Sequence, residues 1–243
     1  MALLGGTLDE LPLLRAAWLV SSLHPASVEL CWTPGSEASA ARPLMLELAR
    51  DAGLDELSPD VLPGLLDRGA LDSVMLSPTL WRRLAGTLWP RLHRTSAYIC
   101  RQASLPPTSV LCCADSYATA AGLLDRLTDV LPDGTTRVTL LRAQPPPSPW
   151  VLGIMAVAGC GLPPEDDPTS DLPIVGGIPE LVIRAPAVEA AAEAFSAMET
   201  SLLVLGWHRH GLPLPERWLH PVAWRLSKSF PSDVLLVPLG GGP

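Results

Sequence analysis

The succession of a strand, a helix and a second strand near residue 190 constrains the fold more than any other feature of this sequence. Residues 180–184 and 201–207 are short apolar runs typical of strands, and residues 187–200 between them repeat apolar side chains at helical spacing. This succession is the unit from which parallel sheets are built. A comparable succession spans residues 109–143. We therefore predict an α/β or α+β fold, with a mixed β-sheet of about five to seven strands and packed helices.

The first hundred residues show mainly helical signals. Thr7 and Glu10 have the spacing of a capping box ahead of a helix that starts near Leu11, and residues 27–33 alternate as one early strand. Proline and glycine punctuate several further helices up to residue 100. We predict a helix-rich N-terminal portion with one early strand at residues 1–105 and an α/β sheet portion at residues 106–243. The two portions could also form one continuous domain.

Composition limits the compartment and the cofactors. Hydrophobic residues make up 48% of the chain, and the longest apolar run, residues 151–162, is shorter than the roughly 20 residues that span a bilayer. The start of the chain lacks the basic residues of a secretory signal. Five scattered cysteines without a C-x-x-C pair indicate neither a disulfide framework nor a zinc site. We expect a soluble, intracellular, cytoplasmic protein with no membrane span, no metal and no cofactor.

Basic and aromatic side chains cluster in an otherwise acidic chain. The formal net charge is −8, yet residues 73–114 hold five arginines and no acidic residue. Arginine and tryptophan are enriched at protein interfaces, although a solvated helix face or a site for single-stranded nucleic acid would have a similar composition. We call residues 81–101 the Arg/Trp segment. Together with the closing helix, it supplies the predicted partner-binding residues, which are Trp81, Arg82, Arg83, Trp89, Arg91, Arg94, Arg101, Trp218 and Trp224.

Two groups could form an active site. His208 and His210 have the alternating spacing that puts two imidazoles on one face of a strand, and Asp166 or Asp167 could complete an acid–base or metal site. Cys160 lies between two glycines after an apolar run, as a nucleophile on a tight turn would. The prolines and acidic residues that follow Cys160 disfavour a reactive thiolate, so an inert cysteine is the simpler interpretation.

A strand-to-helix junction gives one further candidate pocket. Cys112 and Cys113 end an apolar strand, and Asp115 or Ser116 can cap the helix that follows. Ligands of α/β proteins bind at the carboxyl ends of strands, where the first N–H groups of a helix attract anions. The junction lacks the glycine-rich run of a phosphate-binding loop.

The missing catalytic motifs and the Arg/Trp segment favour a non-catalytic function. We predict a protein-binding or assembly subunit, such as an adaptor, a chaperone-like protein or a complex component, whose partner is another protein subunit. The first alternative is an enzyme with a loop-built site around His208 and His210. The second is a protein that binds RNA or single-stranded nucleic acid, which the overall negative charge disfavours.

Overall fold

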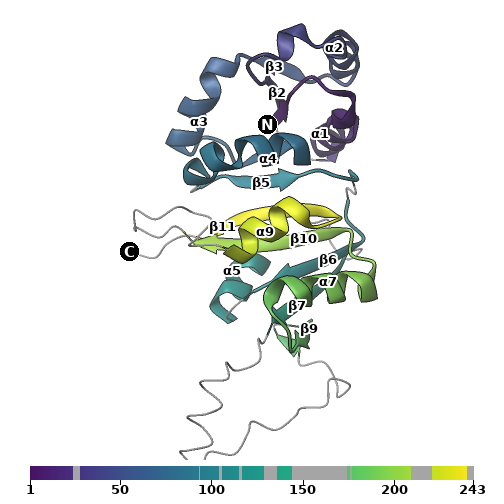
Figure 1. Ribbon diagram of the computed structural model, residues 1–243, viewed down its shortest axis with the longest axis vertical. Helices are drawn as coiled ribbons and strands as arrows, with labels where there is room; N and C mark the ends of the chain where they lie inside the picture. The colour runs from purple at the N-terminus through teal and green to yellow at the C-terminus, as the bar shows by residue number, and fades with distance from the viewer. Residues whose placement is uncertain are drawn as a thin grey trace, which may run out of the picture.

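A sheet with helices on both faces forms the centre of the molecule (Figure 1). The computed structural model describes residues 1–23, 28–92, 94–103, 106–114, 117–128, 136–143, 174–175, 177–208 and 221–239. Within these residues the sheet has eleven strands rather than the smaller number expected from the sequence. The predicted α/β fold with a mixed sheet and packed helices is confirmed.

The N-terminal half alternates short strands and helices. Its strands are β1 (Ala2–Leu4), β2 (Glu29–Trp32), β3 (Asp55–Leu57), β4 (Ser73–Leu76) and β5 (Ser96–Ile99). Its α-helices are α1 (Leu11–Leu23), α2 (Arg42–Asp51), α3 (Leu62–Arg68) and α4 (Pro78–Leu88). Helix α4 begins at a proline, and the Ser77 hydroxyl caps it by accepting a hydrogen bond from the Leu80 amide at 3.2 Å. Residues 1–105 therefore contain five strands where the sequence predicted one.

The C-terminal half has longer strands. They are β6 (Ser109–Cys113), β7 (Arg137–Ala143), β8 (Ile174–Val175), β9 (Ile178–Ile183), β10 (Leu202–His208) and β11 (Asp233–Leu239). Its described α-helices are α5 (Tyr117–Thr128), α7 (Ala187–Met198) and α9 (Pro221–Ser229). The succession β9–α7–β10 confirms the strand–helix–strand unit on which the fold prediction was based. The strand predicted over residues 150–158 lies outside the described residues.

The two halves repeat one topology. The strand order is β3-β2-β1-β4-β5-β11-β10-β6-β7-β9-β8. Strands β1 to β5 are parallel to one another, and so are β6, β7, β9, β10 and β11. In each set the third, second, first, fourth and fifth strands lie side by side in that order. The halves meet where β5 pairs antiparallel with β11, at the middle of the sheet (Figure 1).

The helices form one layer on each face of the sheet. One buried cluster contains side chains of α3, α4, α7 and α9, and the other contains side chains of α1, α2 and α5. Helices α3, α4, α7 and α9 therefore cover one face of the sheet. Helices α1, α2 and α5 cover the opposite face. Because both faces are covered, the central strands are mostly apolar, and every residue of β11 is buried, including Asp233 at its start.

Polar groups join the halves at the ends of β5 and β11, a region we call the seam. The carboxylate of Asp233, which is fully buried, accepts hydrogen bonds from the Tyr98 hydroxyl at 2.6 Å, the Arg101 amide at 2.6 Å and the Gln102 amide at 2.8 Å. Burial and the neighbouring Asp233 carboxylate both raise the pKa of Tyr98, so its hydroxyl stays protonated and donates. The seam therefore uses one carboxylate to hold the chain beyond β5 against β11.

None of the helices in the described part of the chain is long and apolar enough to cross a membrane. The longest of them, α1, has 13 residues. The expectation that the chain has no membrane-spanning helix is thus met within these residues.

Candidate functional site

The strand order changes direction once in each half. Strand β1 lies between β2 and β4. The chain then continues from β2 to β3 on one side of β1 and from β4 to β5 on the other side. Strand β6 has the same position between β7 and β10. In open α/β sheets, ligands bind outside the carboxyl ends of the strands at such a switch point, because the two connections leave a crevice there. The chain therefore has two candidate sites, one at β1/β4 and one at β6/β10.

The β1/β4 switch point holds a buried carboxylate. Glu10, which is 1% exposed, follows β1 by one short turn and folds back over its end. Its Oε2 accepts hydrogen bonds from the amides of Gly5 at 2.8 Å, Gly6 at 3.0 Å and Thr7 at 3.3 Å. Three successive backbone N–H groups that point at one oxygen form an anion-binding nest. Glu10 is therefore the anion in a cradle formed by its own chain.

Strand β4 closes this cradle from the other side. The Ser77 hydroxyl, one residue beyond β4, donates a hydrogen bond to Glu10 Oε1 at 3.1 Å. A Cβ atom at Gly5 would lie 3.1 Å from Glu10 Oε1 and 3.1 Å from Leu80 Cδ2, so a side chain here would press on both the carboxylate and α4. Gly6 adopts a φ of +81°, which also favours glycine. The two glycines thus let the backbone close around the carboxylate.

Burial and hydrogen bonding act in opposite directions on Glu10. Burial raises its pKa because a charged carboxylate loses water, and the hydrogen bonds from Thr7, Gly5, Ser77 and Gly6 oppose that rise. The raised pKa shows that burial is the larger effect.

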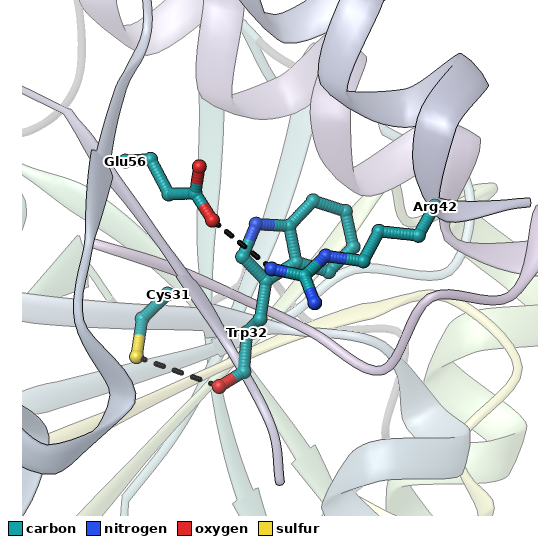
Figure 2. A network of polar contacts seen from close by, with 4 residues as sticks. All are labelled: Cys31, Trp32, Arg42 and Glu56. Carbon is teal, nitrogen blue, oxygen red and sulfur yellow. Dashed lines mark hydrogen bonds and ion pairs between the residues drawn. The ribbon is translucent and has the colours of Figure 1, made fainter. Parts of the chain in front are cut away.

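A second polar network lies at the carboxyl ends of β2 and β3. Figure 2 shows the Arg42 guanidinium over the Trp32 indole, 4.9 Å from the ring centre, with Arg42 Nη2 3.2 Å from Glu56 Oε1. Trp32 is 1% exposed, and its ring Nε1–H has no hydrogen-bond partner within the described residues. The Cys31 thiol lies 3.9 Å from the Trp32 carbonyl oxygen, and burial raises its pKa to about 11. The Arg42–Glu56 pair therefore joins α2 to β3 over the Trp32 ring.

The β6/β10 switch point carries no equivalent carboxylate in the part of the chain that the structure describes. Strand β6 ends at Cys113, and the half-buried Ala114 occupies the place that Gly5 has after β1. Strand β10 ends at His208 on the same edge of the sheet. Burial raises the pKa of Cys113 to about 12, so the thiol is neutral and unreactive at neutral pH. Of the junction predicted from the sequence, Asp115 and Ser116 lie outside the described residues.

Strand β10 packs closely against β11 and α5 near the second switch point. A Cβ atom at Gly206 of β10 would lie 2.5 Å from Leu239 Cδ1 and 3.3 Å from Thr119 Cγ2. A Cβ contact this short would force the Leu239 side chain to move, so the packing favours glycine where β11 and α5 meet over β10.

The tryptophan and arginine at the ends of the Arg/Trp segment pack inside the chain. Trp81 is fully buried, and its indole N–H donates a hydrogen bond to Ser227 Oγ of α9 at 3.0 Å. The Arg101 guanidinium donates to the carbonyl oxygens of Ser232 at 3.2 Å and Ser227 at 2.9 Å. Both side chains therefore join the N-terminal half to the C-terminal half.

The other predicted partner-binding residues are scattered. Arg83 donates to Thr33 Oγ1 at 3.1 Å, and Arg91 lies 3.6 Å from an Asp67 carboxylate oxygen. The Lys228 ammonium lies over the Trp224 ring, 4.0 Å from its centre. Four members remain: Arg82 and Arg94 are exposed, Trp89 is in the 3-10 turn after α4, and Trp218 lies outside the described residues. Their assignment to partner binding stays a prediction.

The proposed His/Asp site falls mostly outside the described residues. His210, Asp166, Asp167 and Cys160 are not described, and only the backbone of His208 is, at the end of β10. Among the described residues, no group of three or more His, Cys, Asp and Glu side chains could hold a metal ion.

The Glu10 cradle was not predicted as a site from the sequence. The Thr7–Glu10 spacing predicted only a helix cap, which accounts for one of the bonds to the carboxylate. The remaining bonds come from Gly5, Gly6 and, across the sheet, Ser77. The Gly5–Gly6 pair directly before the cap was the available signal.

Three solved structures share the architecture over nearly the whole chain. They are a universal stress protein from Archaeoglobus fulgidus (TM-score 0.58, 12% identity, covering 97% of this chain and 95% of that one), a putative universal stress protein from Pseudomonas aeruginosa UCBPP-PA14 (0.58, 15%, 97% and 92%) and a functionally unknown protein from Pseudomonas aeruginosa PAO1 (0.58, 14%, 97% and 91%). At these identities the likeness shows the fold alone. No protein-family profile and no curated protein sequence matches the chain.

This likeness corrects the hypothesis of a non-catalytic adaptor or assembly subunit. Of the three structures that share the fold, one is named a universal stress protein and one a putative universal stress protein, and none is named an adaptor or an assembly subunit. The physical reason for the error is that part of the Arg/Trp segment lies between the two halves of the chain. Two of the residues that suggested a partner surface, Trp81 and Arg101, contact the other half of the same chain.

Proposed function

We propose that the protein is a ligand-binding protein of the universal stress type that binds a nucleoside phosphate at the β6/β10 switch point. The observation that carries this proposal is the strand order, which changes direction between β6 and β10 with helix α5 starting directly beyond β6. The crevice at such a point receives ligands in open α/β sheets, and the N-terminal N–H groups of the following helix bind phosphate.

The ligand belongs in the C-terminal half because the equivalent position in the N-terminal half is filled. The Glu10 carboxylate already accepts the amide hydrogens beyond β1, and a second anion there would be repelled. A mononucleotide suits the site better than a dinucleotide, since no glycine-rich dinucleotide fingerprint follows β6.

Titration with a fluorescent ATP analogue, followed by competition with ATP, AMP and adenosine, tests the proposal. We expect one nucleotide per chain and weaker competition by adenosine, which lacks phosphate. In Ala114→Asp a carboxylate at the end of β6 should weaken binding by about tenfold or more, which corresponds to roughly 1.4 kcal/mol. Ala197→Asp adds the same charge at an exposed position near the end of α7, toward the amino ends of the strands and away from the proposed site. This variant should bind the nucleotide like the native chain.

Two results would contradict the proposal. The first is the absence of phosphate-dependent binding to the native chain. The second is native affinity in Ala114→Asp, which would place any bound nucleotide elsewhere.

A further inference from the structure

The anion cradle of the N-terminal half has a geometry that helix capping does not require. A capping box needs one hydrogen bond from the Thr7 amide to the Glu10 side chain, at 3.3 Å here. The shorter bonds come from Gly5 and Gly6, at 2.8 and 3.0 Å to the same oxygen. Gly5 also donates to Oε1 at 3.0 Å. The donors therefore converge on the charge rather than on the helix end alone.

The cradle also recruits a donor from across the sheet. Ser77 is 1% exposed and lies 67 residues along the chain from Glu10, on the neighbouring strand connection. Its hydroxyl donates to Glu10 Oε1. A site made from the ends of two adjacent parallel strands is where this fold places anionic ligands.

A further buried hydroxyl lies beside the cradle without a partner. Ser36 is 2% exposed, and its Oγ has no hydrogen-bond partner within the described residues. A Cβ atom at Gly6 would lie 3.4 Å from Ser36 Cβ, so this serine packs against the cradle backbone. A buried hydroxyl without a partner is costly, so Ser36 is a polar group of this region whose hydrogen bonding the described residues do not account for.

From these contacts we propose that residues 5–7 and Ser77, with Ser36 packed beside them, form an oxyanion-binding site in the N-terminal half, and that the Glu10 carboxylate is its built-in occupant. In the native chain the Glu10 carboxylate excludes a free anion in two ways. It already accepts the hydrogen bonds of the amides of residues 5–7, and its negative charge repels a second anion. Without the Glu10 side chain beyond Cβ, the site takes a small oxyanion such as formate or inorganic phosphate. The inference does not depend on nucleotide binding at β6/β10, because it concerns different residues in the other half.

Chemical rescue of Glu10→Ala tests this proposal. The variant leaves the cradle donors in place and empties the space of the carboxylate, so its Tm should fall by several degrees. Formate or phosphate should raise that Tm in a saturable way, whereas sodium chloride at equal ionic strength should not. Phosphate binding, measured by titration calorimetry, should be at least tenfold tighter in Glu10→Ala than in the native chain.

Glu10→Gln is the matched control. Its side-chain amide has nearly the size of the carboxylate and still fills the cradle, so phosphate should shift its Tm no more than it shifts the Tm of the native chain. All variants share the same C-terminal half, so any phosphate bound there contributes equally and cancels in the comparison. If Glu10→Ala does not stay folded, its refolding yield in phosphate against chloride gives the same readout. Equal effects of phosphate and chloride on Glu10→Ala, or an equal response in Glu10→Gln, would overturn the proposal.

Discussion

Replacing Asp233 by alanine should destabilise the protein by about 4 kcal/mol, because three donors at the seam lose their acceptor. A buried donor without a partner costs roughly 1–3 kcal/mol. The Tyr98 hydroxyl is buried, so its cost is about 2 kcal/mol, in the middle of that range. The amides of Arg101 and Gln102 are partly buried, so water can reach them, and each contributes about 1 kcal/mol.

Urea unfolding, followed by tryptophan fluorescence and by circular dichroism, measures this loss. The slope against urea concentration should stay near the native value if the variant loses stability without changing the surface exposed on unfolding. Asp233→Asn retains one acceptor oxygen and the same shape, and it should cost less than half as much as Asp233→Ala.

A double-mutant cycle tests whether the effect arises from the hydrogen bonds. Tyr98→Phe removes one donor and should cost about 1 kcal/mol. In the Asp233→Ala background the same change should cost less, because the hydroxyl has already lost its acceptor. A loss below about 1 kcal/mol in Asp233→Ala, or additive costs in the double variant, would refute the reasoning.

Two further predictions concern arginine and pH. Arg101→Ala should destabilise the chain by about 2 kcal/mol, since two carbonyl oxygens at the seam lose their donor, while Arg82→Ala at an exposed position should stay within about 0.5 kcal/mol in the same urea assay. Equal losses would contradict the structural role of Arg101. The raised pKa of Glu10 means that the folded chain holds this proton to a higher pH than the unfolded chain. Its stabilising contribution is present at low pH and is lost as pH rises from about 4 through the raised pKa, so the stability of the native chain relative to Glu10→Gln should fall over that window. A difference that is constant with pH, or that grows, would contradict this sign.

The sequence was sufficient to predict the class of the fold and the longer elements. Residues 180–207 were recognisable because β10 is seven residues long and α7 has a clear small-residue stripe. Strands β1 and β3 have only three residues each, too few to show any periodicity, and β1 begins directly after Met1. Such strands are specified by their neighbours in the sheet, so local pattern alone could not identify them.

The repeated topology was hidden for a related reason. Its two copies have the same strand order, but their strands and connections differ in length: β1 has three residues and β6 has five. Sequence repeats are recognised by a constant period, and here no period is conserved. Composition did detect the seam, since Trp81 and Arg101 have the chemistry of an interface. It could not show that the other side of this interface is the chain itself.

Among the described residues, the two switch points differ in one testable feature, the presence of a carboxylate. At β1/β4 the chain supplies Glu10, whereas directly beyond β6 the described chain ends at Ala114, in the place that Gly5 has after β1. Since the strand order is the same in both halves, topology alone would give both sites the same affinity for anions. Removing the carboxylate in Glu10→Ala and adding one in Ala114→Asp should therefore change anion binding in opposite directions. If both variants bound anions like the native chain, local charge would not be what distinguishes the two halves.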